Sequence, residues 1–256
     1  MDLRFVSEER SMLGEGVELR SFVGERDDGR PVHCWVVIAD PKHAEVAVQT
    51  APWGTARTVG EHVDTAVKRG KKVLAATNAD FFHLAAGTLT PYGAQIVDGV
   101  VIYEPHTRER YGNLWFGMTF DGTPVIGDAE DYFGTYVGLL KNAVGGGVLL
   151  LKDGTVVCDP ENNPGPRTWV GYAPDGTVAL AITDGRQADW SVGMTLAEQA
   201  QLLLDLDVGI TDAINLDGGG STAMVTCDET GQKTLRNRVC VSPERPVADT
   251  LMIVQK

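Results

Sequence analysis

The sequence lacks any long apolar run. No stretch approaches the roughly twenty consecutive apolar residues that a membrane-spanning helix needs. The first ten residues, MDLRFVSEER, are charged throughout and contain no apolar core of a signal peptide. We therefore expect no membrane span. The compartment stays open between the cytoplasm and an exported protein whose signal has been trimmed.

Basic residues are scarce as well. The chain has 22 Lys and Arg against 35 Asp and Glu, which gives a formal net charge of −13. Such a field repels nucleic-acid backbones and anionic membrane surfaces, so we expect neither as a partner. An anionic substrate would need a local group of arginines to overcome this repulsion.

The signatures of several common enzyme classes are missing. The four cysteines form no CxxC pair, which argues against a zinc ribbon or a thioredoxin-type site. No GxSxG elbow of an α/β-hydrolase occurs, and the glycines at 145–147 lack the Gly-Lys-Ser/Thr ending of a nucleotide P-loop. Cys227 and Cys240 could form a disulfide in an oxidising compartment, but buried free thiols are the favoured interpretation.

What the sequence does contain is a turn-rich chain with material for one sizeable core. Its 256 residues include 30 glycines and are 43% hydrophobic, and no low-complexity or proline-rich linker divides them. Strand patterns at 32–38, 45–49, 72–78 and 178–183 accompany helical patterns at 58–69 and 195–207. We expect a single α+β domain with a mixed, mainly antiparallel sheet and few helices. Residues 1–31 form an N-terminal extension or edge strands, and residues 32–256 form the main domain.

Two stretches of the chain resemble each other. Thr58 and Glu61 precede a helix that feeds a strand ending at Asn78, and residues 195–217 repeat the order. Thr to Asn spans 20 residues in both copies, and Glu to Asp spans 19. Thr-x-x-Glu is also an ordinary capping box, so part of the match is expected by chance. We interpret the pattern as an internally duplicated strand–helix–strand unit related by a pseudo-twofold axis.

The sharpest functional signal is the motif NLDGGGST at residues 215–222. Asn215 and Asp217 lie two apart near a strand end, so their side chains share one face. Three successive glycines remove every Cβ beyond them and let a ligand approach the backbone donors, whereas a plain turn rarely needs three. We predict Asp217 as a catalytic carboxylate. The candidate substrate-binding residues of the motif are Asn215, Gly218, Gly219, Gly220, Ser221 and Thr222.

The first copy carries a similar pair, Asn78 and Asp80. If the two copies pack about a twofold axis, their strand ends converge and present both amides and both carboxylates to one cleft. Asn78 is then a substrate-binding candidate and Asp80 a second catalytic carboxylate. The alternative, in which these side chains cap neighbouring backbone, is open.

Two arginines follow or precede strands in positions that suit an anion. Pro166-Arg167-Thr168 begins one strand, and Asp184-Gly185-Arg186 ends another. Guanidinium groups match phosphate oxygens in bidentate geometry. Arg167, Thr168 and Arg186 are therefore substrate-binding candidates and Asp184 is a catalytic candidate. Glu198 is a further catalytic candidate, although its position in Thr-x-x-Glu favours a capping role.

These motifs, taken together and in this order, resemble the phosphodiester glycosidase domain family. The resemblance rests on residues 78–82 (NADFF), the glycines at 145–147, residues 166–168 (PRT), 184–186 (DGR), 193–196 (GMTL) and the 215–222 motif. It covers roughly residue 32 to the end of the chain. It implies an α+β catalytic domain at 32–256 that hydrolyses a sugar–phosphate diester. As a separate hypothesis, we expect the protein to act in bacterial glycan or cell-envelope polysaccharide metabolism.

The chemistry implied by the resemblance is cleavage of an anomeric C–O bond. A phosphomonoester leaves, so its negative charge must be neutralised by Arg167 and Arg186 with help from the glycine amides. Asp217 stabilises the oxocarbenium-like centre or activates water, with Asp80 or Asp184 as the second carboxylate. No cofactor is required by this scheme, and the partner is a carbohydrate phosphodiester. The oligomeric state is not indicated.

Two alternatives remain open at this stage. The carboxylates and amides could instead hold Mg²⁺ or Ca²⁺ in a metal-dependent phosphodiesterase that cleaves the P–O bond. A non-catalytic glycan-binding module is the other alternative, with tryptophans supplying a sugar platform. Core packing is the commoner role for tryptophans.

Overall fold

A computed structural model of the whole chain describes residues 3–85, 88–107, 111–159 and 163–256. These described residues form one domain of antiparallel sheets with three short α-helices, α1 (Val59–Lys68), α2 (Ala129–Asp131) and α3 (Leu196–Asp205). A π-helical turn, η1 (Tyr132–Tyr136), follows α2, and a 3₁₀ turn, η2 (Gly219–Ser221), follows the motif aspartate. The expected α+β fold class, with a mainly antiparallel sheet and few helices, is confirmed.

The largest sheet has eight strands, and its neighbouring strands pair antiparallel. Within the segment 1–31, expected as an extension or edge strands, residues 3–26 form a hairpin at one edge of this sheet. The order is β1 (Leu3–Gly14), β2 (Val17–Arg26), β3 (Pro31–Ala39), β16 (Val178–Thr183), β15 (Arg167–Tyr172), β17 (Asp212–Asn215), β13 (Val148–Lys152) and β14 (Thr155–Val156).

A five-stranded sheet packs against this one. Its order is β19 (Lys233–Leu235), β18 (Met224–Cys227), β5 (Val73–Asn78), β20 (Asp249–Gln255) and β4 (Ala44–Thr50). The central core lies between the two sheets and joins inward-facing residues such as Leu180 and Ile214 of the first to Leu74 and Ile253 of the second. Because both facing surfaces are apolar, burial of this core is the main stabilising contribution.

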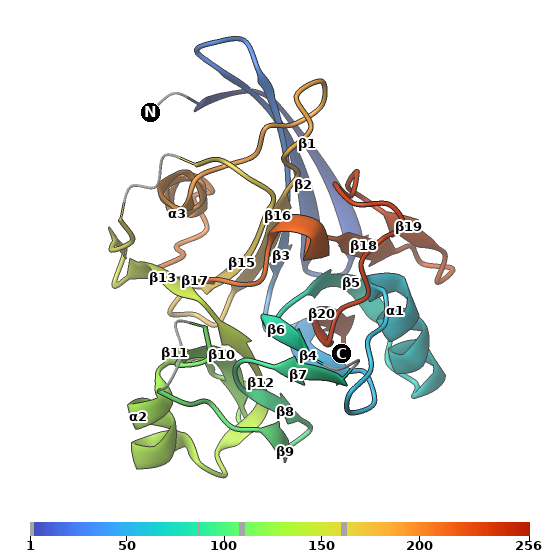
Figure 1. Cartoon of the computed structure of the whole chain (residues 1–256), viewed down its shortest axis with the longest axis vertical. Helices are drawn as coiled ribbons and strands as arrows, with labels where there is room; N and C mark the ends of the chain where they lie inside the picture. The colour runs from blue at the N-terminus through green and yellow to red at the C-terminus, as the bar shows by residue number, and fades with distance from the viewer. Residues whose placement is uncertain (1–2, 86–87, 108–110, 160–162) are drawn as a thin grey trace.

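The two longer helices cover the outer faces of this sandwich. Apolar residues of α3, including Ala200 and Leu203, pack on the outer face of the eight-stranded sheet. Val63 and Ala66 of α1 pack on the outer face of the five-stranded sheet. Figure 1 shows α3 and α1 on opposite sides of the two sheets. The inner strands β5 and β16 are therefore buried on both faces, which explains why they read as continuous runs of small and apolar residues.

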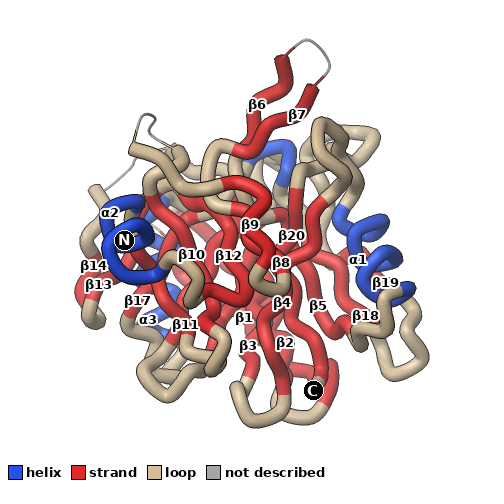
Figure 2. Tube along the Cα trace, turned by 90° about the horizontal axis from the view of Figure 1, so that it is seen from below, coloured by secondary structure: helices blue, strands red, loops and turns tan. Residues whose placement is uncertain are grey.

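A third sheet and a small hairpin complete the chain. The third sheet has the order β11 (Pro124–Gly127), β10 (Leu114–Thr119), β12 (Leu140–Gly146), β8 (Gln95–Val97) and β9 (Val100–Tyr103). The hairpin of β6 (Phe82–Ala85) and β7 (Thr88–Pro91) stands out from the body in Figure 2.

The two strand–helix–strand units have matching topology. β4 and β5 both pair antiparallel with β20, which lies between them, and β16 and β17 flank β15 in the same way. Both helices begin with a complete capping box, at Thr58 with Glu61 and at Thr195 with Glu198. The structure thus gives both units the same path, while their origin by duplication stays a prediction.

Candidate active site

The ends of β5 and β17 lie side by side, one from each large sheet. The Asn78 side-chain amide donates to the Asp217 carbonyl at 2.5 Å, and the Asp217 N–H donates to the Ala79 carbonyl at 2.9 Å. The Asn78 side-chain oxygen accepts from Thr168 Oγ1 at 2.8 Å. Asn78 and Thr168 are buried, and their polar atoms are occupied by these bonds. They therefore hold the Asp217 backbone in place from beneath.

A cavity of about 550 Å³ opens above these strand ends. Seven of the predicted site residues line it, and the motif glycines form part of its wall. It also takes in Arg245 and the aromatic rings of Phe81 and Tyr111, which sequence reasoning had not assigned to the site. The predicted residues in the lining are Arg167, Arg186, Asn215, Asp217, Gly218, Gly219 and Gly220.

Asp217 is the carboxylate of this cavity. Burial raises the pKa of Asp217 to about 6, while hydrogen bonds from the Ser221 hydroxyl and the Gly218 N–H and the charge of Arg245 act in the opposite direction. These donors fix the orientation of the carboxylate. A carboxyl group with a pKa near 6 is still mostly ionised at neutral pH, yet it is a stronger base than an ordinary aspartate.

Guanidinium groups lie against the glycine run. A Cβ on Gly219 would lie 3.2 Å from an Arg186 nitrogen, and one on Gly220 only 2.5 Å from an Arg245 nitrogen. Gly219 also has a φ of +62°, which glycine adopts without strain. Only glycine therefore admits both arginines so close to the backbone. Among the described residues that line the cavity, three arginines face a single carboxylate, which gives this acidic protein a local cationic site.

The Arg167 side chain bonds to backbone carbonyls beside the cavity. Its guanidinium donates to the carbonyls of Met194 at 3.4 Å and Asn163 at 3.1 Å. Arg186 adopts a positive φ of +60°, at the turn that follows β16, and its side chain is exposed. Arg245 is also exposed, and its Nη1 donates to Ser221 Oγ at 3.5 Å. Arg186 and Arg245 are the guanidinium groups best placed to receive an anion.

Another part of the cavity lining carries two aromatic rings and one unsatisfied acceptor. The Phe81 and Tyr111 rings stack with centroids 4.2 Å apart and planes inclined by 20°. Asn215, 4% exposed, uses its side-chain N–H on the Leu216 carbonyl, and its Oδ1 has no hydrogen-bond partner among the described residues. Asn215 pairs with Val148, next to Gly147, and a Cβ on Gly147 would meet both rings. The Phe81 and Tyr111 rings therefore lie near the buried Asn215 acceptor.

The sequence model of one protein family, described as phosphodiester glycosidase, matches residues 71–254, which is most of the chain. The chain belongs to the phosphodiester glycosidase family. The resemblance read from the motifs is therefore confirmed, and with it the assignment to hydrolases of this type. The match begins within the main domain, after the β1–β2 hairpin and the β3 and β4 strands.

Curated relatives and a solved structure agree with this assignment. The Mus musculus N-acetylglucosamine-1-phosphodiester alpha-N-acetylglucosaminidase is 30% identical over 181 residues, covering 63% of this chain and 33% of that protein. The Homo sapiens protein of the same name is 28% identical over 232 residues, covering 82% and 43%. The chain spans less than half the length of these relatives. The zebrafish catalytic domain of that name, auto-inhibited by its pro-peptide, has the same fold, with a TM-score of 0.70, 24% identity, and coverage of 100% of this chain and 89% of that chain.

Asp80 does not line the Asp217 cavity of this phosphodiester glycosidase. It is 2% exposed, its Oδ2 accepts from the Gly93 N–H at 2.8 Å, and its Oδ1 has no partner within the described chain. Burial, followed by the nearby charge of Asp249, raises the pKa of Asp80 well above its usual range. Gly145 packs on it so closely that a Cβ there would lie 2.4 Å from Oδ1. Asp80 therefore supports the site from within the core.

Asp184 is also buried outside the cavity. Its carboxylate accepts from the Asn237 side chain at 2.8 Å, from Trp190 Nε1 at 2.7 Å and from the Arg238 N–H at 2.8 Å. Burial raises the pKa of Asp184, and these three donors lower it. Because every donor comes from the turns around Arg186 and the chain beyond the glycine run, Asp184 orients those turns. Thr222 belongs to the same arrangement, since its carbonyl also accepts from Asn237 at 3.1 Å.

Glu198 is placed away from the cavity as well. It forms a bidentate ion pair with Arg26 at 2.8 and 2.9 Å and completes the capping box of α3 by accepting from the Thr195 N–H at 2.8 Å. Both partners of the ion pair are buried. The capping interpretation of Glu198 therefore agrees with its contacts, and the ion pair ties α3 to β2.

We expect Glu198→Ala to destabilise the protein without disabling its chemistry. The substitution leaves the Arg26 guanidinium buried and unpaired, which lowers the free energy of unfolding by about 3–5 kcal/mol. Glu61→Ala is the matched control, because Glu61 occupies the same capping position in α1 but is exposed, so only about 1 kcal/mol is expected. Denaturant unfolding and kcat on the folded fraction measure both effects. A kcat reduced a hundredfold in folded Glu198→Ala would make this residue catalytic instead.

A metal centre is not evident from the side chains. Within residues 3–85, 88–107, 111–159 and 163–256, no group of three or more His, Cys, Asp and Glu side chains is arranged to hold an ion. Activity in the presence of EDTA tests whether the reaction requires Mg²⁺ or Ca²⁺. In the same part of the chain, no helix has the length and apolar character to cross a membrane.

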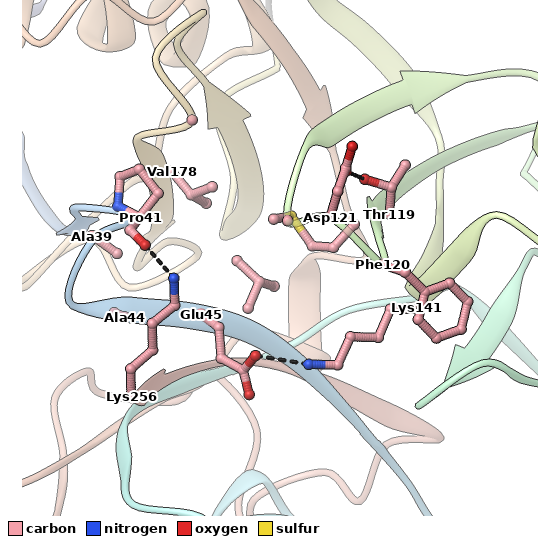
Figure 3. Close-up of a pocket in the computed structure, with 14 residues that line it drawn as sticks. Ala39, Pro41, Ala44, Glu45, Thr119, Phe120, Asp121, Lys141, Val178 and Lys256 are labelled. Carbon is pink, nitrogen blue, oxygen red and sulfur yellow. Dashed lines mark hydrogen bonds and ion pairs between the residues drawn. The ribbon is translucent and has the colours of Figure 1, made fainter.

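A second cavity, of about 260 Å³, lies between β4, β10 and the end of the chain (Figure 3). Its charged groups are already engaged: Lys141 pairs with Glu45 at 2.8 Å, and Lys256 donates to the Pro41 carbonyl. Asp121 accepts from the Thr119 hydroxyl. These groups of the second cavity thus bond to neighbouring lining residues, whereas Asn215 Oδ1 in the site around Asp217 has no partner among the described residues.

Proposed function

We propose that this protein hydrolyses a sugar-1-phosphodiester at the anomeric C–O bond and releases free sugar and a phosphomonoester. The observation that carries the proposal is the juxtaposition of Asp217 with Arg186 and Arg245 across three glycines in one cavity. The curated relatives are named as N-acetylglucosamine-1-phosphodiester glycosidases, which supports the same reaction type. We place the natural substrate among the phosphodiesters of bacterial glycans or cell-envelope polysaccharides.

The arginines serve the leaving group in this proposal. A phosphomonoester needs little help from a general acid, but it gains negative charge as the C–O bond breaks. Arg186 and Arg245 offer planar, permanently charged donors that stabilise this charge more in the transition state than in the substrate. The absence of a second carboxylate from the described lining of the cavity agrees with a reaction that needs no acid at the leaving oxygen.

Asp217 serves the anomeric carbon. As the bond to phosphate lengthens, positive charge develops on the sugar, and a carboxylate beside it stabilises that charge or removes a proton from the attacking water. The Ser221 hydroxyl and the Gly218 N–H hold the carboxylate in one orientation, so little reorganisation accompanies the reaction.

The composition of the cavity lining suggests how the substrate lies. The phosphate fits beside the arginines and glycine amides, and the sugar fits beside Phe81, Tyr111 and Asn215. Aromatic rings pack against the C–H faces of sugars, and the buried Asn215 Oδ1 is an acceptor for a sugar O–H or N–H. In this pose Asp217 lies beside the bond that breaks.

The test is product analysis on methyl and aryl sugar-1-phosphodiesters, with and without EDTA. We expect free sugar and a phosphomonoester to be released at the same rate in both conditions. Sugar 1-phosphate as product, with loss of activity in EDTA, would instead establish a metal-dependent phosphodiesterase. Saturable binding of the diesters without any turnover would establish a glycan-binding module.

The pH dependence of the reaction should report on Asp217. Because the carboxylate is the active form and the pKa of Asp217 is raised to about 6, kcat/KM is expected to rise with pH through about 6 and then level off. An ordinary aspartate would place this limb near pH 4. Initial rates at low substrate concentration between pH 4 and 9 measure the position of the limb. A limb near pH 4 would contradict the role of a buried Asp217.

A further inference from the structure

One peptide group connects the catalytic loop to a buried carboxylate on another strand. The Ala79 carbonyl accepts from the Asp217 N–H at 2.9 Å, and the N–H of the same peptide, on Asp80, donates to Asp249 Oδ1 at 2.8 Å. Asp249 begins β20, which lies between β4 and β5. Hydrogen bonds in such a chain strengthen one another, so the bond to Asp217 depends on the acceptor that Asp249 supplies.

Asp249 is itself firmly held. It is fully buried, and its second oxygen, Oδ2, accepts from Gln95 Nε2 at 2.7 Å. Gln95 lies on β8, in the third sheet, and is 3% exposed. The carboxylate thus links the five-stranded sheet to the third sheet at the point where β5 ends.

The two buried aspartates differ in how their oxygens are satisfied. Both oxygens of Asp249 accept hydrogen bonds, whereas Asp80 has one oxygen without a partner among the described residues. Burial raises the pKa of both groups, to about 6 for Asp249 and well above the usual range for Asp80. When two carboxyl groups are buried side by side, the free energy is lowest if one of them keeps its proton, because two buried negative charges repel each other. The hydrogen bonds assign the proton to Asp80 and the negative charge to Asp249.

We infer that Asp249 is a positioning residue for the proposed hydrolysis, which fixes Asp217 through the peptide between residues 79 and 80. The inference rests on the proposed function for its catalytic consequence and on the hydrogen bonds alone for its structural part. Without the Asp249 acceptor, the peptide loses its anchor and the Asp217 backbone gains freedom. A carboxylate displaced by about 1 Å costs roughly a hundredfold in rate.

Two substitutions separate the hydrogen bond from the charge. Asp249→Asn keeps an oxygen that accepts from the Asp80 N–H. Its amide N–H can donate to the Gln95 side-chain oxygen once the Gln95 amide group flips. Asp249→Ala removes the acceptor. We expect kcat to fall about thirtyfold to a hundredfold in the alanine variant, with KM changed less than about threefold, and to stay within about threefold in the asparagine variant.

A control on the same strand tests whether general destabilisation explains the loss. Thr250→Val removes the bond from Thr250 Oγ1 to the Gln49 carbonyl (3.2 Å) beside Asp249, without touching the 79–80 peptide. We expect kcat of this variant to match the wild type. An equal fall of kcat in Asp249→Asn and Asp249→Ala, or in Thr250→Val, would overturn the inference, as would wild-type kcat in Asp249→Ala.

Amide hydrogen exchange tests the structural part independently of turnover. The Asp217 N–H bonds to Ala79, while the neighbouring Leu216 N–H bonds to the Thr168 carbonyl at 2.8 Å and provides an internal reference. In Asp249→Ala, we expect protection of Asp217 to fall about tenfold relative to Leu216, with no such fall in Asp249→Asn. An unchanged ratio would overturn the inference. A wild type that turns over no diester would refute the proposed function and leave this measurement valid.

Discussion

Asp217→Asn is expected to lower kcat by about a thousandfold, which is within the range typical of a positioned acid or base. The asparagine keeps the size of the side chain. Its oxygen can accept from the Gly218 N–H and its amide can donate to the Ser221 hydroxyl, the two groups that hold the carboxylate. The variant therefore folds with the same local geometry but has no negative charge to place beside the anomeric carbon and no basic oxygen for water.

Binding of the leaving group should not fall together with kcat in Asp217→Asn. Removing the Asp217 charge takes away an anion next to the phosphate site, so methyl phosphate is expected to inhibit the variant as well as it inhibits the wild type, or more strongly. Steady-state kinetics with methyl phosphate as inhibitor measures this. Asp189→Asn is the control, because Asp189 is exposed and pairs with Arg238 at 3.2 Å, outside the cavity. Retention of more than a tenth of wild-type kcat in Asp217→Asn would remove this residue from the mechanism.

The double variant Arg186→Asn, Arg245→Gln is expected to lower kcat/KM by about a thousandfold or more. Each guanidinium supplies charge-assisted hydrogen bonds to the phosphate, and removal of one such donor from a preorganised site costs about 2–4 kcal/mol in the transition state. Asparagine is chosen at position 186 because it tolerates the positive φ of +60° found there. Unlike Asp217→Asn, this variant should also weaken inhibition by methyl phosphate, by about tenfold or more.

The comparison with a remote arginine completes this test. Arg238→Gln removes a guanidinium that is exposed and paired with Asp189, and it should leave both kcat/KM and phosphate inhibition unchanged. If the double variant lost activity without any change in phosphate inhibition, the arginines would not bind the leaving group. If Arg238→Gln lowered kcat/KM as much as the double variant does, a general loss of positive charge would explain the result.

Local patterns in the sequence carried a large part of the prediction. The two Thr-x-x-Glu capping boxes predicted where both longer helices begin, because capping depends on residues three positions apart. The NLDGGGST motif predicted the centre of the cavity, since a strand end followed by three glycines needs no distant partner to be recognised. The family resemblance rested on several such short motifs in order.

The roles of the individual carboxylates could not be predicted from local patterns. Asp80, Asp184 and Glu198 carry the same functional group as Asp217. Each of them, however, accepts hydrogen bonds from donors elsewhere in the chain, such as Gly93, Asn237 and Arg26. Whether a carboxylate faces a cavity or a buried donor depends on contacts that span more than a hundred residues in the cases of Glu198 and Asp249. No spacing in the sequence reports such contacts.

The sheet-rich fold class, the helix starts and the run of three glycines can be predicted from the sequence, because they follow from conformational preferences of neighbouring residues. The packing of the sheets decided which charges meet. It brought Arg245 to the glycines, Tyr111 to Phe81 and Asp249 to the peptide before Asp80. Burial and distance set the strength of an electrostatic interaction, and both are properties of the packed sheets.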